Sequence, residues 1–307
     1  MDLIRTTLKT VRLGEPKTEK GLTVFPLFGP AVTEREYITL EDALEAGTAR
    51  VTEVSGEGSV PELKFDNEGA QPVILIDGAT LLGAKQDRVI NITIVAPGKM
   101  VTVIPVSCCE AGRWHRRSAA FKSAGYTMYA EARAAKTAQV SRSMATTGSR
   151  SSDQGAIWRD IAMKMGSVGS RSDTSAMNEM YSQLGERIES YAEKFPSAEG
   201  QTGVLLGLDG RITGLDLFDN SETLAAYLPQ LLRSCAVDAL GRGEEAERPT
   251  PVEAAEEFFT DVAEAVVRQY PAVGLGEDLR FESGKVTGGA LAISGRIVHL
   301  AAFRSDQ

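Results

Sequence analysis

Cysteine and histidine are scarce in this sequence. Its 307 residues include three cysteines, two of them adjacent (Cys108 and Cys109), and two histidines. Three cysteines make a poor disulfide framework, so a reducing, cytoplasmic compartment is expected. His115 and His299 lie far apart and no CxxC or HxxxH spacing occurs, which argues against a closed Cys/His zinc site. No cofactor is predicted, but magnesium stays open, because such a site needs only one or two carboxylates and substrate oxygens.

Long hydrophobic runs are absent as well. No apolar stretch approaches the ~20 residues that span a bilayer, and the charged start MDLIRTTLKTVRLGEPKTEKG lacks the apolar core of a secretory signal. The composition is 42% hydrophobic and 24% charged, with a mean hydropathy of −0.13, as in soluble globular proteins. We therefore expect a cytoplasmic protein with no membrane partner.

Positive charge is in the minority and unevenly placed. The formal net charge of −9 disfavours nucleic acid as a general partner. Between residues 113 and 171, however, eleven Lys and Arg stand against three acids, a local balance of +8. Such a segment attracts anionic ligands, or it forms an ordinary solvated helix face. Its cations are Arg113, Arg116, Arg117, Lys122, Arg133, Lys136, Arg142, Arg150, Arg159, Lys164 and Arg171.

The order of strand and helix signals predicts an α+β fold. Residues 1–114 carry β-branched runs cut by Gly, Pro and Asn, which indicates an antiparallel β-rich layer containing the segments GAKQDR and CCEAGRW. Residues 115–200 form a helical, loop-rich basic part. Residues 201–307 form a C-terminal part of a hairpin, two helices and strands. We expect the three parts to pack into one compact unit.

Capping signals place the first helices. Thr39 and Asp42 form a capping box for a short helix that Gly47 ends. Ser152 is the expected cap of a later helix that stops at Gly166.

Helical spacing of apolar residues then predicts one helix from Met177 to about Tyr191. The Ser/Gly/Arg stretches at 141–153 and 166–173 are expected to be flexible connections, or loops that order over a ligand.

The C-terminal part begins with a hairpin signal, the turn pair Asp209-Gly210. A helix over 221–240 follows, capped by its first residue, and Pro229 should kink or restart it. A capping box at Thr250 starts another helix over 250–270. Three short strands complete the chain.

Polar side chains crowd into GAKQDR, between two apolar runs. If these runs pair as strands, Lys85 and Arg88 can reach one anion, Arg as a two-pronged donor and Lys as a point charge. Gln86 and Asn91 add amides suited to a sugar or base edge. Each residue alone also fits a surface ion pair or a backbone contact. Together they favour an anion or nucleotide pocket.

A second polar segment, CCEAGRW, ends the β-rich part. Cys108 and Arg113 have the C-x4-R spacing of loops that hold an oxyanion near a thiolate. Glu110 would place a carboxylate inside that cradle, so Cys108 is either a nucleophile or a small buried residue at a strand end. Arg113 adds a cation, and Trp114 adds a ring for stacking. The sequence contains no GxSxG, Walker A or GxGxxG motif.

The strings LIDGATLLGAKQDRVINITI and IPVSCCEAGRW resemble the ARG and Rhodanese-Phosphatase-superfamily-associated protein domain family, in whose name ARG stands for ADP-ribosylglycohydrolase. SDQGAIWRDI, GLDLFDNSETLAAYLPQLL and VGLGEDLRFESGKV running into IVHLAAF are similar to it too. The resemblance extends from about Leu22 to Phe303 and implies one family-wide domain. Asp87 stands where the family usually has Asn, and Cys109 is particular to this chain. The residues in the matching strings are Lys85, Gln86, Arg88, Asn91, Ser107, Cys108, Glu110, Arg113, Trp114, Gln154 and Trp158.

The resemblance implies NAD-derived or ADP-ribose-linked metabolism, and two functions follow. In the first, the protein binds, and as an enzyme processes, a phosphorylated ribose or nucleotide. Its catalytic candidates are Glu110, as a general base, and Cys108. Its ligand-binding candidates are Lys85, Gln86, Arg88, Asn91, Arg113, Trp114, Gln154 and Trp158.

The alternative is a non-catalytic sensor that binds ADP-ribose or an ADP-ribosylated partner. A third hypothesis, a scaffold whose basic middle binds RNA, is disfavoured by the net charge of −9. The sequence does not decide between enzyme and sensor, and it does not give the oligomeric state.

Overall fold

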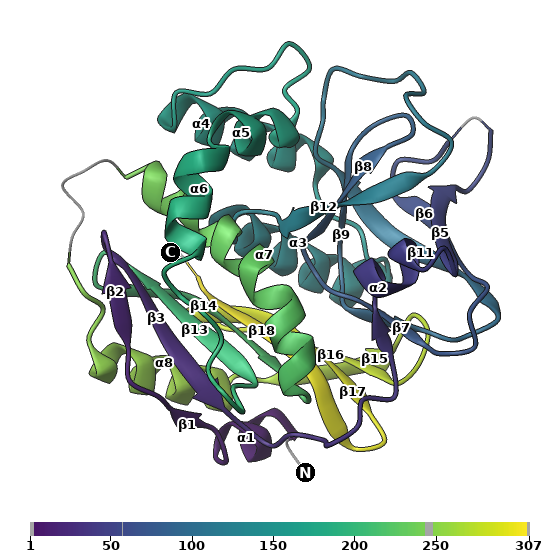
Figure 1. The fold of residues 1–307 in the computed structure, drawn as a ribbon. Coiled ribbons are helices and arrows are strands. Elements are labelled where there is room, and N and C mark those ends of the chain that lie inside the picture. Colours follow the sequence, from purple (N-terminus) through teal and green to yellow (C-terminus); the bar gives the residue numbers. More distant parts are fainter. Residues whose placement is uncertain (1–2, 57, 243–247, 306–307) are drawn as a thin grey trace.

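The computed structural model describes residues 3–56, 58–242 and 248–305, and Figure 1 shows its fold. It confirms a compact α+β protein. No helix in the described ranges combines the length and apolarity needed to cross a membrane. The helices of these ranges are α1 (Leu3–Leu8), α2 (Leu40–Glu45), α3 (Ala130–Thr147), α4 (Gln154–Ser167), α5 (Met177–Gln183), α6 (Gly185–Ala192), α7 (Ser221–Leu240) and α8 (Val252–Glu264).

Strands from the first half of the chain close into a small barrel, in the order β11-β6-β5-β12-β8-β9. Buried side chains such as Val51, Phe65 and Ile104 pack within it, as expected for a barrel of this size. A short sheet, β10-β7-β4, lies beside it. These strands are β4 (Ile38–Thr39), β5 (Ala49–Glu53), β6 (Glu62–Asn67), β7 (Val73–Leu75), β8 (Ala79–Gly83), β9 (Arg88–Ile90), β10 (Ile94–Ala96), β11 (Met100–Cys108) and β12 (Phe121–Thr127).

A large antiparallel sheet joins the two ends of the chain, in the order β1-β3-β13-β14-β18-β17-β16-β15, with β2 also paired to β3. Leu205 of β13 lies opposite Phe25 of β3, so the N-terminal strands complete the sheet of the C-terminal part. The boundaries at residues 114 and 200 stay predictions. The strands are β1 (Arg12–Leu13), β2 (Lys17–Glu19), β3 (Leu22–Phe28), β13 (Gly203–Leu208), β14 (Arg211–Phe218), β15 (Val267–Pro271), β16 (Glu277–Glu282), β17 (Val286–Ile293) and β18 (Arg296–Arg304).

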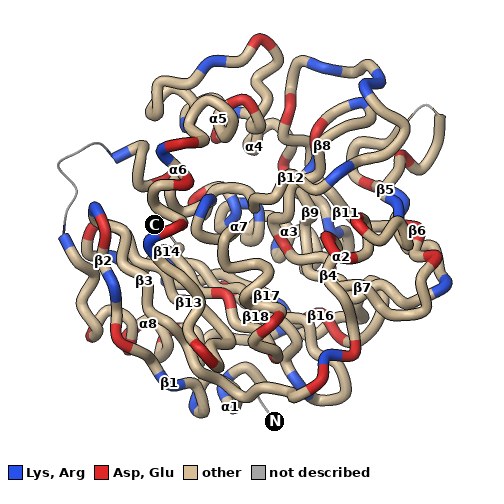
Figure 2. The backbone as a smooth tube through the Cα atoms, in the orientation of Figure 1, with Lys and Arg blue, Asp and Glu red and all other residues tan. Residues whose placement is uncertain are grey.

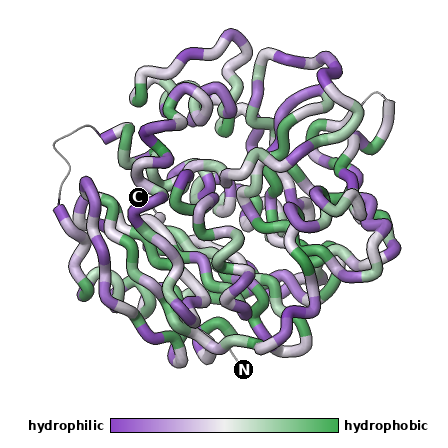
Figure 3. Tube along the Cα trace, viewed as in Figure 1, coloured by the Kyte–Doolittle hydropathy of each residue, from purple (hydrophilic) through white to green (hydrophobic). Residues whose placement is uncertain are grey.

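Helices cover both faces of the large sheet. On one face, α1 and α8 bury side chains such as Ile4 and Phe258 against the strands. On the other face, α3 and α7 separate the sheet from the barrel (Figure 1). The strands of the large sheet and α7 carry much of the hydrophobic sequence, as the green segments of Figure 3 show. The two cores therefore share the sheet, which makes the molecule one packed unit.

Two local predictions are confirmed by their hydrogen bonds and turns. Thr39 caps α2 through a complete capping box with Asp42. Asp209 and Gly210 both have positive φ, +50° and +80°, in the tight turn between β13 and β14, as a two-residue hairpin of this hand requires.

Two predicted N-caps are wrong by one residue. Asp153, not Ser152, caps α4 by accepting from the Ala156 N–H, because the Ser152 hydroxyl is 2.6 Å from Ser107 Oγ instead. Asn220, not Ser221, caps α7 and accepts two backbone N–H bonds. Pro229 lies inside α7, which neither stops nor restarts there.

Three helix boundaries also differ from the predictions. The single helix predicted over 177–191 is two helices, α5 and α6, which meet at Leu184 before the poor helix former Gly185. Helix α8 ends at Glu264, because residues 267–271 pair with β16 as a strand. Helix α3 extends to Thr147, so the first half of the predicted loop 141–153 is helical.

The cap predicted at Thr250 is absent. Pro251 occupies the N-cap position of α8 without a side-chain hydrogen bond. Thr250 Oγ1 has no partner among the described residues, while its N–H bonds to Thr23 Oγ1 at 2.9 Å.

Part of the basic middle segment lies inside the protein. Arg113, Arg133, Lys136 and Lys164 are all buried, and each one pairs with carboxylates. Figure 2 shows blue and red segments interspersed over the remaining backbone. Four of the eleven cations are therefore neutralised inside the protein.

Candidate functional site

The loop Gly83–Asp87 connects β8 to β9 at one mouth of the barrel. A Cβ at Gly83 would lie 2.6 Å from Ser118 Oγ and the residue has φ +133°, so the turn requires glycine. The next residue, Ala84, donates its N–H to Ser118 Oγ at 2.9 Å. These contacts fix the path of GAKQDR and bring the following residue, Arg88, onto β9.

Arg88 is fully buried, and its guanidinium is only partly bonded. It lies opposite Leu81 and Cys108 in the strand register, so the three side chains share one face of the sheet. Its Nη1 donates to Gln86 Oε1 at 3.2 Å. Its Nε and Nη2 have no hydrogen-bond partner among the described residues. The side-on edge of Arg88, which suits a two-oxygen anion, therefore has no hydrogen-bond acceptor among the described residues.

Cys108 ends β11 beside this guanidinium. Its thiol donates to the Glu110 carbonyl at 3.0 Å. Burial raises the pKa of the thiol, while the Arg88 charge and the indole N–H of Trp158 oppose that shift. The balance favours the neutral thiol, which is a weak nucleophile.

Gln154 and Trp158 of α4 complete the wall around Cys108. Gln154 bonds both backbone groups of Cys108, accepting from its N–H at 2.8 Å and donating to its carbonyl at 2.7 Å. Trp158 Nε1 is buried and has no partner of hydrogen-bond geometry among the described residues. Helix α4 is thereby clamped to the barrel mouth through Gln154.

Arg113 and Glu110 form a closed ion cluster with Asp87. Arg113 donates to both Glu110 oxygens from Nε, at 2.8 and 2.9 Å, and lies 3.1 Å from Asp87 Oδ1 through Nη2. Its Nη1 donates to the carbonyls of Ala84 and His115. The donors of Arg113 are thus occupied by the protein, and its role is to join the loops at 83–88 and 110–115.

The carboxylates of this cluster have opposite pKa shifts. Burial acts to raise the pKa of Glu110, but hydrogen bonds from Arg113, the Asp87 N–H and Thr174 lower it below its ordinary value. Burial raises the pKa of Asp87 despite the Gly83 N–H and Arg113. Glu110 is ionised and fully bonded, which fits a structural role. Its assignment as a general base stays a prediction.

A second polar chain ties the barrel to the loop before α4. Ser107 Oγ donates to Asn91 Oδ1 at 2.6 Å, and Asn91 Nδ2 donates to the Arg150 carbonyl at 2.9 Å. Asn91 therefore helps to shape the wall behind Cys108, and a ligand contact from it stays a prediction.

Lys85 and Trp114 lie at the rim of the mouth. Trp114 is 48% exposed, and its ring centre lies 5.3 Å from Lys85 Nζ and 5.8 Å from Arg88 Cζ. The indole thus covers the Arg88 guanidinium on the solvent side, where a side-chain rotation would change access to it.

The structure brings most of the sequence-derived site residues to the same end of the barrel, although they come from four segments of the chain. Cys108 lies opposite Arg88 in the strand register, the Trp114 ring lies near the Arg88 guanidinium, and Gln154 bonds the Cys108 backbone. Arg113, one of the three predicted ligand-binding cations, is bonded to carboxylates. The ligand-binding roles of Lys85, Arg88 and Arg113 stay predictions.

Sequence reasoning missed a buried ion network between the barrel and the large sheet. Arg133 joins Asp77 of the barrel side, at 3.2 Å, to Asp216 of β14, at 2.7 Å. His299 lies 3.0 Å from Asp216 and 2.7 Å from Thr93 Oγ1. The signal available was the charged residue inside otherwise apolar strands, such as the Asp in GLDLF.

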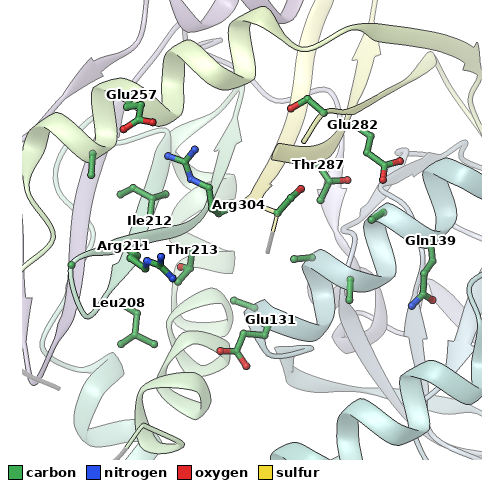
Figure 4. A pocket seen from close by; sticks show the side chains of 18 of the residues that line it. Glu131, Gln139, Leu208, Arg211, Ile212, Thr213, Glu257, Glu282, Thr287 and Arg304 are labelled. Atoms are coloured by element: carbon green, nitrogen blue, oxygen red, sulfur yellow. The ribbon is translucent and has the colours of Figure 1, made fainter. Parts of the chain in front are cut away.

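A cavity beside the large sheet was missed too. Figure 4 shows this space of about 770 Å³ beside α3, with Arg211, Arg304, Thr287, Glu282 and Glu131 among its walls. Carboxylates already pair with most of its arginines, in Arg142–Glu282, Arg242–Glu131 and Arg304–Asp261. Charge on these walls is therefore largely balanced, unlike that on Arg88.

In residues 3–56, 58–242 and 248–305, no group of three or more His, Cys, Asp or Glu side chains could hold a metal ion. The magnesium expectation stays a prediction.

The fold and site define a class: an α+β protein in which a small barrel, with a buried polar mouth, packs through helices on a large antiparallel sheet. The chain belongs to the ARG and Rhodanese-Phosphatase-superfamily-associated Protein domain family, whose model it matches over residues 10–303. That name links the family to ADP-ribosylglycohydrolase and to rhodanese–phosphatase systems. No curated protein and no solved structure matches the chain.

Proposed function

We propose that this protein binds a phosphorylated ribose or nucleotide at the barrel mouth, with Arg88 as the receptor for phosphate. The observation that carries the proposal is the fully buried guanidinium whose Nε and Nη2 have no hydrogen-bond partner among the described residues. A buried charge without an opposite charge costs several kcal/mol. An anion bound to the Nε and Nη2 groups of Arg88 would remove that cost, because a phosphate accepts both N–H groups at once.

The surrounding residues take distinct parts in this proposal. Trp114 and Lys85 at the rim would contact the sugar or base, and Trp158 would add a donor from α4. Gln86 holds the Nη1 end of Arg88 and so directs the other edge toward the ligand.

Five further residues, Asn91, Cys108, Glu110, Arg113 and Gln154, would support the mouth rather than bind. Their hydrogen-bonding groups are already used within the protein.

The ribose part of the proposal comes from the family. Its name refers to ADP-ribosylglycohydrolase, an enzyme of ADP-ribose. Compounds of NAD-derived or ADP-ribose-linked metabolism contain a ribose that carries phosphate. Arg88 alone would accept other phosphorylated compounds, so the ribose must be tested directly.

A non-catalytic sensor is the second candidate, and a specific observation favours it. Burial raises the pKa of the Cys108 thiol, and both Glu110 oxygens accept hydrogen bonds from protein donors. Neither group is poised as a nucleophile or base in this arrangement.

Titration calorimetry with ribose 5-phosphate tests the binding proposal. We expect heat of binding in the native protein and none in Arg88→Met, which keeps the buried chain length but removes the N–H groups. Arg171→Gln, an exposed change in the same basic segment, should bind normally. Binding that survives Arg88→Met would contradict the proposal.

Product analysis after incubation with ribose 5-phosphate, ADP-ribose and NAD separates the two candidates. Binding without conversion supports the sensor, whereas conversion of any of the three supports the enzyme.

A further inference from the structure

The cavity of about 770 Å³ in Figure 4 takes no part in the proposed function. It lies between α3 and one end of the large sheet, where the β13–β14 turn, the β16–β17 turn and the end of β18 lie side by side. Arg211, Ile212 and Thr213 stand on one side of the space, and Gln139 of α3 stands on the other. Its volume falls within the range of roughly 300–1,000 Å³ that is typical of pockets for small molecules.

Small apolar side chains form one wall of the cavity. Ala130, Ala134 and Ala138 are spaced four residues apart on α3, so they lie on one face of the helix, and all three line the cavity. Leu208 and Ile212 line it from the β13–β14 hairpin. Apolar walls around an open space favour an apolar guest, because contact removes both surfaces from water. The cavity therefore suits a ligand with an apolar body.

The charged side chains of the walls leave one cation unmatched. Four arginines and three glutamates line the cavity, so the formal charge of its walls is +1. Carboxylates bond three of these arginines, in the pairs Arg142–Glu282, Arg242–Glu131 and Arg304–Asp261. The fourth, Arg211, is exposed and has neither an ion pair nor a side-chain hydrogen bond with the described residues. Its guanidinium is therefore available to the oxygen atoms of a ligand.

We propose that this cavity is a second ligand site, which takes a small organic monoanion with an apolar body. The anionic group binds to Arg211, and the body lies along the face of α3 that carries the three alanines. The paired arginines add little attraction, because neighbouring carboxylates offset their charge. One negative charge on the ligand then completes the balance of the walls. The site is separate from the barrel mouth and does not depend on a phosphate at Arg88.

Two dyes with the same rings test the site by fluorescence titration. Anilinonaphthalene sulfonate is a monoanion, and its parent anilinonaphthalene is uncharged. We expect both dyes to bind the native protein, because both can lie along the alanine face. Failure of the anionic dye to bind would overturn the proposal.

Arg211→Gln removes the unmatched charge. We expect it to weaken the anionic dye about tenfold, as for the loss of a hydrogen bond to a charged group, and to leave the neutral dye unchanged. Arg187→Gln, an exposed change on α6 outside the cavity, is the matched control and should bind both dyes as the native protein does. Native affinity for the anionic dye in Arg211→Gln, or equal weakening of the two dyes, would contradict the proposal.

Ala134→Leu fills the space that the rings would occupy. We expect it to weaken both dyes at least about tenfold, because overlap with the larger side chain is unfavourable. Ala145→Leu, on the same helix but exposed and outside the cavity, should leave both affinities unchanged. If thermal melting shows that Ala134→Leu does not fold, Ala138→Leu takes its place. Native affinity for both dyes in a folded variant would rule out this cavity as their site.

Arg88→Met distinguishes this site from the barrel mouth. Because Arg88 does not line the cavity, the variant should bind the anionic dye with native affinity. Loss of that binding would place the dye at the barrel mouth, which would overturn the second site and leave the proposed function standing.

Discussion

Two buried arginines of one short region have opposite environments. Arg113 is bonded to Glu110, three residues away, and to Asp87, twenty-six residues away. Arg88 has the neutral Gln86 and the Asp87 carbonyl as its acceptors among the described residues. The sequence predicted both as phosphate ligands, because residue type alone does not show which cation finds a carboxylate. That choice depends on how the loops at 83–88 and 110–115 meet.

Arg88→Met should stabilise the ligand-free protein. Methionine fills a similar volume without burying an uncompensated charge, and such replacements are neutral or stabilising by about 1–4 kcal/mol. Denaturant unfolding without phosphate would show a raised free energy of unfolding. A loss of more than about 1 kcal/mol would indicate that Arg88 supports the fold, and it would contradict the role of Arg88 as a phosphate receptor.

Glu110→Gln should destabilise the protein strongly. The change removes one charge of a fully buried pair, which typically costs about 3–5 kcal/mol. Glu199→Gln, at an exposed position, is the matched control and should change the free energy of unfolding by less than about 0.5 kcal/mol. Similar denaturation curves for the two variants would contradict the role given to the cluster.

At the scale of elements, the sequence located helices better than it located their ends. Thr39 was correctly predicted as a cap because its partner Asp42 is local. Ser152 was not, because a residue distant in sequence, Ser107, takes its hydroxyl. The strand at 267–271 replaced the predicted end of α8 for the same reason, since β16 supplies hydrogen bonds that a local pattern cannot reveal.

The cap of α7 gives a direct test of such an assignment. Asn220 Oδ1 accepts from the N–H groups of Glu222 and Thr223, and Asn220 Nδ2 donates to the Val32 carbonyl. Asn220→Ala should therefore lower the free energy of unfolding by about 1–2 kcal/mol. Ser221→Ala, at the cap expected from the sequence, should cost less than about 0.5 kcal/mol. Chemical denaturation of both variants would decide, and a larger loss in Ser221→Ala would reverse the assignment.

At the scale of the whole molecule, a buried ion network holds the barrel against the sheet. Asp77 is bonded to Arg133 and Lys136 of α3, and Arg133 continues to Asp216. Burial acts to raise the pKa of Asp216, but Arg133 and His299 lower it below its ordinary value of 3.8. An acid with a lowered folded-state pKa stabilises the protein above its unfolded-state pKa, and this stability is lost as the pH falls through the folded value.

Acid should therefore unfold the protein through this network. We expect the free energy of unfolding to decrease steeply below about pH 4, and Asp216→Asn to make that decrease shallower while lowering stability at pH 7 by about 3–5 kcal/mol. Asp173→Asn, at an exposed position, should leave the pH profile intact. The measurement is urea denaturation between pH 3 and 7. An unchanged acid slope in Asp216→Asn would rule out this carboxylate as its source.

The sequence by itself determined the α+β class, the tight turn at 209–210 and the polar segments that meet at the barrel mouth. These follow from hydrophobic periodicity, turn chemistry and short polar motifs, which act over a few residues. Only the tertiary structure decided that N-terminal strands complete the C-terminal sheet, and that Arg133 bridges the two halves. It alone left Nε and Nη2 of Arg88 without a hydrogen-bond acceptor among the described residues, while Arg113 gained two carboxylates. The physical reason is that burial and ion pairing depend on neighbours in space, and the partner of a buried charge is often distant in the sequence.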